Sequence, residues 1–251
     1  PYAMYSGRLC EGYSIIDEYT QGEYGKSIAK DLGIKLGIFD DPFQTPAVVT
    51  AYETLLAANK EIDFEMILRF SEELSTRCPF VCANIASVIS SILIDEFQDT
   101  NELQYSILAN IFKANKSIKL MFAGDVNQAI YGSLGGVAKC KAELDTLYET
   151  TFKELRLTGC YRSTQRVVNL YKNFEVSQTG VCSVADIKDA TGTINYCRST
   201  SKENLTVEIA AIIRSELASG TPSEEICVLA PRWQNLLSLS RDLRSQLPNV
   251  L

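Results

Sequence analysis

Between residues 62 and 123 the spacing of apolar positions predicts helices separated by short strands. The first stretch has helical spacing and predicts a helix that ends near Pro79. Its apolar positions are Phe64, Ile67, Leu68 and Leu74. Short apolar runs at 92–94 and 118–123, each followed by acidic residues or glycine, predict buried parallel strands around a helix over 103–111. This order indicates α/β architecture with a site at the carboxyl ends of the strands.

The second half of the chain repeats this alternation less regularly. Its pattern predicts three strands and three helices. The strands are expected over 155–157, 193–197 and 226–230, and the helices over 167–171, 205–217 and 233–247. Residues 1–61 carry weaker signals, and we expect short helices there in a partial or accessory segment. Two α/β lobes, 62–153 and 154–251, are expected to follow it.

Composition narrows the chemistry that the chain can carry. The 251 residues include no histidine and have a net charge of −7 at pH 7. Without histidine, Ser–His–Asp and Cys–His catalysis are excluded, so any chemistry must use carboxylates, lysine, arginine or a bound metal. The negative charge argues against a general nucleic-acid-binding surface but leaves a local basic groove open.

The lack of a recognisable targeting signal and the spacing of the cysteines favour a cytoplasmic protein with no membrane partner. No apolar run approaches the roughly 20 residues that span a bilayer, and residues 1–20 lack the apolar centre of a secretory signal. Of eight cysteines, only Cys78 and Cys82 lie close together. A metal site needs more soft ligands at short spacing. We therefore expect the cysteines to be small buried side chains in a reducing cytosol.

Asp95 and Glu96 follow the apolar run at 92–94 and form a pattern typical of a Walker B element. At the mouth of a sheet, the first carboxylate can hold Mg²⁺ and the second can orient and deprotonate the water that attacks a γ-phosphate. An apolar strand followed by two acids is a weak signal alone, because a solvated acidic strand end has the same pattern. The six residues 95–100, DEFQDT, are much more specific.

Three motifs resemble those of UvrD/Rep-type superfamily 1 DNA helicases, in the same order and at similar spacing. Residues 95–100 resemble motif II, 124–131 (GDVNQAIY) resemble motif III, and 160–163 (CYRS) resemble motif IV. Weaker matches at 62–64 and 226–232 extend the resemblance. It implies a P-loop NTPase (RecA-like) fold of parallel sheets with flanking helices. The chain would then hold two partial motor lobes, part of the first and the start of the second.

The resemblance also implies a role for each matching residue. Asp95 would help to hold Mg²⁺ and ATP, and Glu96 would be the catalytic base. Gln128 would lie near the γ-phosphate, and Arg162 would be an arginine finger that neutralises charge on the transferring group. Tyr131 would lie near single-stranded DNA and could stack on a base. The alternatives are that Gln128 caps a turn, Arg162 makes a surface ion pair and Tyr131 belongs to the core.

The implied function is an ATP-dependent DNA helicase or translocase motor, moving 3′ to 5′, that uses ATP and Mg²⁺. Its partner would be single-stranded or partly duplex DNA, and a nuclease or a repair protein is a candidate partner. The chain departs from the family where Ser133 and Leu134 replace the aromatic residue and the arginine of motif III, and where Cys160 replaces the asparagine of motif IV.

No complete P-loop pattern can be recognised in the sequence. The only Gly-Lys-Ser, around Lys26, lacks the first glycine of the pattern. The late family motifs are also missing, since one of them requires histidine. We therefore expect a truncated chain that is inactive alone. A non-catalytic helicase-like DNA-binding or scaffold subunit is the alternative, and a non-helicase NTPase that uses Lys26 is a third hypothesis.

Overall fold

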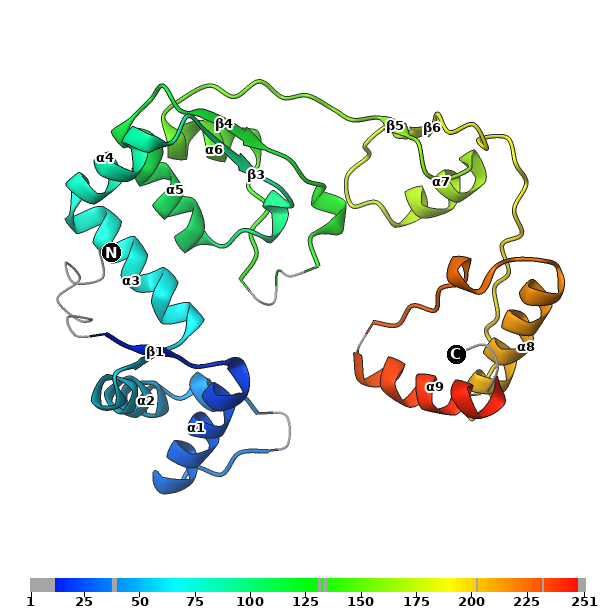
Figure 1. Cartoon of the computed structure of the whole chain (residues 1–251), viewed down its shortest axis with the longest axis horizontal. Helices are drawn as coiled ribbons and strands as arrows, with labels where there is room; N and C mark the ends of the chain where they lie inside the picture. The colour runs from blue at the N-terminus through cyan, green and yellow to red at the C-terminus, as the bar shows by residue number, and fades with distance from the viewer. Residues whose placement is uncertain are drawn as a thin grey trace. The chain divides into compact units, whose positions relative to one another are not determined.

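The structure is a computed structural model that describes residues 12–37, 40–130, 132, 135–201, 203–231 and 233–247. Contacts divide the chain into two compact units, Pro1–Ala190 and Thr191–Leu251 (Figure 1). The lobe boundary that we expect near residue 153 falls inside the first unit, so the assignment of two motor lobes stays a prediction. Within the described ranges no helix has both the length and the apolar character needed to cross a membrane.

The N-terminal part of the first unit is helical, as expected. It consists of β1 (Ser14–Ile15), α1 (Glu18–Asp31), the 3-10 helix η2 (Pro42–Gln44), α2 (Pro46–Asn59) and β2 (Glu61–Ile62). The strands β1 and β2 pair in parallel. Tyr52, Leu56 and Ile62 are buried between these elements, together with Ile16 and Met66. The two α-helices have 14 residues each, so they are longer than the short helices that the sequence predicts.

The Gly-Lys-Ser sequence lies inside α1 and not in a phosphate-binding loop. Gly25 is buried, and a Cβ atom there would lie 2.8 Å from Pro42 Cγ and from Phe43 Cζ. Lys26 makes an exposed ion pair with Glu23 at 3.2 Å. A P-loop needs free backbone N–H groups ahead of a helix, and here those groups belong to a helix interior. The hypothesis of an NTPase that uses Lys26 is therefore wrong.

The next part of the first unit is the α/β arrangement that the sequence predicts. Its elements are α3 (Phe64–Arg77), α4 (Pro79–Val88), β3 (Ser91–Ile94), α5 (Glu102–Ala114), β4 (Lys119–Phe122) and α6 (Lys141–Tyr148). The strands β3 and β4 are parallel and adjacent, and α5 packs against α3, α4 and α6. The sequence did not predict α4, because Pro79 looked like a helix end. Proline is also favoured at the first helical position, and Pro79 occupies it.

The described residues cover only one of the two faces of the β3–β4 pair. Ile92 and Leu120 pack toward a core built around the fully buried Tyr105 and Tyr148. On the other face, Leu93 is 72% exposed and Met121 is 58% exposed. The expectation of strands buried on both faces is therefore wrong for the described part of the chain. A continuous apolar run indicates two apolar faces, but it does not supply the element that covers the second face.

The rest of the first unit contains short elements. They are β5 (Gly159–Cys160), α7 (Gln165–Tyr171), the 3-10 helix η6 (Lys172–Phe174) and β6 (Cys182–Ser183). The strands β5 and β6 pair in parallel, and α7 agrees with the predicted helix. The strand expected over 155–157 is wrong, because residues 151–158 are irregular and Leu157 is 93% exposed.

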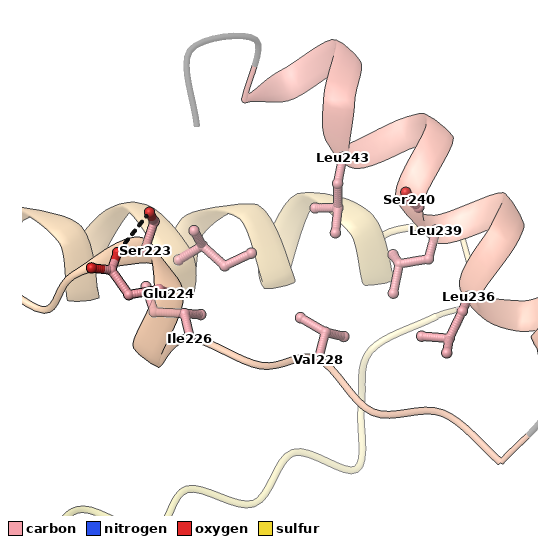
Figure 2. Close-up of a pocket in the computed structure, with 9 residues that line it drawn as sticks. Ser223, Glu224, Ile226, Val228, Leu236, Leu239, Ser240 and Leu243 are labelled. Carbon is pink, nitrogen blue, oxygen red and sulfur yellow. Dashed lines mark hydrogen bonds between the residues drawn. The ribbon is translucent and has the colours of Figure 1, made fainter. Parts of the chain in front are cut away.

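The second unit consists of α8 (Leu205–Ala218), the 3-10 helix η7 (Ser223–Glu225) and α9 (Trp233–Gln246). Both α-helices agree with the prediction, whereas the strands expected over 193–197 and 226–230 are absent from these described residues. Ile226, Val228 and Leu243 line an apolar pocket of about 360 Å³ between the two helices and the segment after η7 (Figure 2). The residues that line this pocket belong to the second unit, whereas the predicted site residues Asp95, Glu96 and Arg162 belong to the first.

The cysteines correct another expectation. Cys82 is buried, and its Sγ donates to the Ser75 carbonyl oxygen at 3.4 Å. Burial raises the pKa of its thiol. Cys140, Cys182 and Cys197 are exposed, and so is Cys227. The expectation that all are buried is therefore wrong. Small apolar size permits burial of a cysteine but does not require it.

The buried Asp63 carboxylate links α2 to the start of α3. It is 4% exposed, its Oδ1 accepts from Met66 N at 2.7 Å, and its Oδ2 accepts from the Tyr52 hydroxyl at 2.7 Å. We predict that Asp63→Ala lowers the free energy of unfolding by about 2–4 kcal/mol, because the helix loses its N-cap and a buried hydroxyl loses its acceptor. Urea unfolding of the chain measures this change.

Asp63→Asn is the matched control, since asparagine also caps helices and keeps an oxygen in the same place. It should cost clearly less than Asp63→Ala. Equal losses for the two variants would contradict the stabilising role of the cap and of the hydrogen bond from Tyr52.

Candidate nucleotide-hydrolysis site

Two acidic turns lie at the same edge of the β3–β4 pair. The first comprises residues 95–99 after β3, and the second comprises residues 124–128 after β4. The register pairs Ile94 with Phe122, so both strands end at the same level. Two backbone hydrogen bonds continue beyond the strands, from Ala123 N to Ile94 O at 2.8 Å and from Phe97 N to Ala123 O at 3.0 Å. The carboxyl ends of parallel strands thus bring the acids of both motifs together.

Glu96 has a left-handed backbone, with φ 49° and ψ 45°. This conformation is unfavourable for a residue with a Cβ atom, and it occurs here at the sharp turn between β3 and the 3-10 helix η3 (Phe97–Asp99). The side chain is exposed, and its Oε2 accepts a hydrogen bond from Gln98 Nε2 at 2.6 Å. The other carboxylate oxygen has no hydrogen bond to a described residue and can accept one from water or a ligand.

Gln98 joins the two acidic turns. Its side chain is 2% exposed, which is unusual for glutamine. While Nε2 donates to Glu96, Oε1 accepts from Asp125 N at 3.0 Å. One buried amide therefore accepts from the Asp125 backbone N–H in the second turn and holds one carboxylate oxygen of Glu96 in the first. Burial without such partners would be costly, so these bonds are expected to hold the two turns in register.

Gly124 is required by the close approach of the two turns. A Cβ atom at this position would lie 2.2 Å from Gln98 Oε1, 2.7 Å from Phe97 Cδ1 and 3.0 Å from Phe97 N. Any side chain here would displace the buried amide. Sequence reasoning missed both Gln98 and Gly124 as functional positions. Both lie within the quoted motifs, but nothing in their spacing shows that Gln98 points inward.

Gln128 ends the 3-10 helix η4 (Val126–Gln128), which the Asp125 side chain caps. Asp125 Oδ1 accepts from Asn127 N at 2.9 Å, and its Oδ2 accepts from Gln128 Nε2 at 3.1 Å. Gln128 is exposed. The Gln128 amide thus stabilises the turn that contains Asp125, which agrees with the alternative that Gln128 caps a turn. The phosphate-sensing role of Gln128 stays a prediction.

Arg162 lies in the bend after β5, and its side chain is exposed. Backbone N–H groups of Ser163 and Arg162 donate to Cys160 and lower the pKa of its thiol, and the Tyr171 hydroxyl also contributes a hydrogen bond. Between described residues, no hydrogen bond or ion pair joins the Arg162 side chain to the acidic turns. Tyr131 lies outside the described residues, as do Ser133 and Leu134, so the predicted DNA contact has no structural description.

The donor set fits a Mg²⁺ ion that is shared with a nucleotide. Asp95 is exposed at the sheet edge, and its Oδ1 accepts from Glu96 N at 3.0 Å, which leaves Oδ2 available. Mg²⁺ beside phosphates usually takes one or two carboxylates and completes its shell with water and phosphate oxygens. A buried Asp99 Oδ1 in the same turn has no hydrogen-bond partner. Such an atom requires a donor, and none comes from the described residues.

Comparison with known proteins identifies the central part of the chain. The family model described as UvrD/REP helicase N-terminal domain matches residues 40–149. ATP-dependent DNA helicase PcrA of Leuconostoc citreum is 31% identical over 132 residues, which are 52% of this chain and 17% of PcrA. DNA helicase II of Haemophilus influenzae is 33% identical over 108 residues, 43% of this chain and 14% of that protein.

A eukaryotic relative gives the same result. ATP-dependent DNA helicase SRS2 of Saccharomyces cerevisiae is 28% identical over 120 residues, which are 47% of this chain and 10% of SRS2. The chain thus spans less than a fifth of the length of these relatives. The family implies a P-loop NTPase fold, in agreement with the parallel β3–β4 pair. Residues 40–149, which include both acidic turns, therefore match the UvrD/REP helicase N-terminal domain, and this match is consistent with a fragment of a UvrD-like helicase.

Proposed function

We propose that this chain is part of an ATP-dependent DNA helicase or translocase motor. The observation that carries the proposal is the joined pair of acidic turns at one edge of the β3–β4 sheet, held together by Gln98. This is the edge where α/β sheets bind ligands. The matched relatives PcrA and SRS2 are named ATP-dependent DNA helicases, which supports DNA as the substrate and ATP as the nucleotide that is hydrolysed.

In the proposed reaction each residue has a separate task. Asp95 would hold Mg²⁺, whose chemistry is to neutralise charge on the phosphate oxygens. The free oxygen of Glu96 would hold and deprotonate the attacking water, while Gln98 keeps the carboxylate oriented. Gln128 would respond to the γ-phosphate from the second turn. Arg162 is exposed and available to neutralise the transferring group.

The parts of the motor beyond these turns are proposed from the family. Movement would run 3′ to 5′ along single-stranded DNA, with Tyr131 near the strand. The lysine that holds the phosphates would come from a P-loop outside these 251 residues, since Lys26 lies in a helix interior. A cytoplasmic location and a nuclease or repair partner belong to the same proposal.

We predict that the isolated 251-residue chain does not hydrolyse ATP at a helicase-like rate, because Asp95 and Glu96 lack a P-loop partner. Phosphate release with and without single-stranded DNA measures this. DNA-stimulated hydrolysis by the isolated chain would contradict the prediction if Glu96→Gln abolished it and Glu65→Gln, an exposed glutamate in α3, did not. A protein that joins the chain to a Gly-Lys-Thr P-loop should hydrolyse ATP, and Glu96→Gln should lower its kcat by about 10²–10⁴-fold.

Failure of that longer protein to hydrolyse ATP would favour the alternative function, a non-catalytic DNA-binding or scaffold subunit. The observation that favours this alternative is the replacement of two motif III residues by Ser133 and Leu134. Loss of a stacking aromatic weakens the hold on single-stranded DNA by about 1–3 kcal/mol per base. Binding of labelled single-stranded DNA without ATP turnover would identify the scaffold.

In the same ATP-hydrolysing protein, we predict that Gln98→Met lowers kcat by about tenfold, which corresponds to roughly 1.4 kcal/mol in the barrier. Methionine fills a similar volume but makes neither hydrogen bond, so the Glu96 carboxylate loses its orientation. The KM for ATP should change little, because Gln98 is buried and acts through Glu96. Steady-state kinetics measure both constants.

The matched control is Gln234→Met, at an exposed glutamine of α9. It should leave kcat unchanged. A rise in KM for ATP with unchanged kcat in Gln98→Met would show that Gln98 acts on nucleotide binding and not on the orientation of Glu96.

A further inference from the structure

The Asn127 side chain connects the second acidic turn to a segment about fifty residues later in the chain. Its Oδ1 accepts from Val176 N at 2.8 Å and from Ser177 N at 3.0 Å. Its Nδ2 donates to the Ser177 carbonyl oxygen at 3.1 Å. Both ends of one amide are thus bonded to backbone groups of two consecutive residues. This is a directed contact, since a side chain that merely lies on a surface does not satisfy three backbone groups at once.

The receiving loop is itself well ordered by local bonds. Glu175 accepts from Thr179 Oγ1 at 2.9 Å and from Thr179 N at 3.4 Å, which closes the loop around residues 176–177. The loop follows α7 and η6 directly. Asn127 therefore bonds to a loop that is also closed by its own local hydrogen bonds.

The electrostatic surroundings of Tyr171 also include the second acidic turn. The pKa of Tyr171 in α7 is raised by burial, by the nearby Cys160 and Glu175, and by the carboxylate of Asp125. Asp125 begins the turn that carries Asn127, and Cys160 begins the motif that carries Arg162. Tyr171 thus lies within electrostatic range of the second acidic turn.

These contacts join the parts of the site that otherwise remain apart. Between described residues, the three bonds of Asn127 are the hydrogen bonds that join residues 62–153 to residues 159–190. Asn127 and Gln128 are consecutive residues of η4. Asn127 thus links the short helix that carries Gln128 to the loop at 176–177.

We infer that Asn127 is a positioning residue that docks the Arg162-bearing segment, residues 159–183, onto the second acidic turn. The inference rests on the proposed function, because Gln128 and Arg162 are the groups that it aligns. Asn127 touches no reacting atom in this assignment. It transmits the position of η4 to the segment that supplies the arginine.

Hydrogen exchange of the 251-residue chain tests the docking without ATP. In Asn127→Ala the amides of Val176 and Ser177 should exchange at least about fivefold faster, the loss of one hydrogen bond of ordinary strength. Asn127→Asp keeps an acceptor for both amides and loses only the donor to Ser177 O, so it should retain part of the protection. Asn59→Ala removes a comparable exposed amide bond, to Glu61, and should leave both amides unchanged.

Unchanged exchange in Asn127→Ala would overturn the docking, and so would equal acceleration in Asn59→Ala, which would indicate general destabilisation. In the ATP-hydrolysing protein, Asn127→Ala should lower kcat severalfold at constant KM for ATP, with partial recovery in Asn127→Asp. Normal kcat in Asn127→Ala would overturn the positioning role. If that protein does not hydrolyse ATP at all, the proposed function fails, while the exchange result still decides the docking.

Discussion

The parallel register of β3 and β4 is the constraint on which the candidate site depends. Because Ile94 pairs with Phe122, the strands end at the same level and the chain turns away from both at the same edge. A shift of the register by one residue would exchange the two faces of a strand and move its acidic turn away from its neighbour. The core around Tyr105 and Tyr148 opposes such a shift, since it fixes which side of each strand faces inward.

Glu96 illustrates how strain and hydrogen bonding balance at this edge. Its left-handed backbone costs of the order of 1 kcal/mol or more, and such positions persist only where the surroundings hold them. Here the surroundings are the backbone bond from Phe97 N to Ala123 O and the buried amide of Gln98. The carboxylate is therefore oriented before any nucleotide is present. Preorganised groups of this kind avoid a reorganisation cost during the reaction.

Sequence patterns predicted the helices far better than the strands. The helices at 64–77, 102–114 and 205–218 each carry an apolar face, and a helix satisfies its own backbone groups. The motif strings also located the acidic turns correctly, because they are local. The pairing of Gln98 with both turns was beyond sequence reasoning, since it depends on Gly124 allowing a close approach from a distant strand.

The strands that were predicted wrongly have the same local signals as those that were predicted correctly. The run at 226–230 is as apolar as the run at 92–94. Among the described residues, however, only the run at 92–94 hydrogen-bonds to a neighbouring strand. A strand exists only through its partner, so an apolar run without a described neighbour remains irregular, even though Ile226 and Val228 pack against the helices of the second unit. Leu229 is 88% exposed and Leu93, on the uncovered face of a true strand, is 72% exposed. In both places the chain carries more apolar surface than its described elements bury, on the uncovered face of the β3–β4 pair and in the segment after η7.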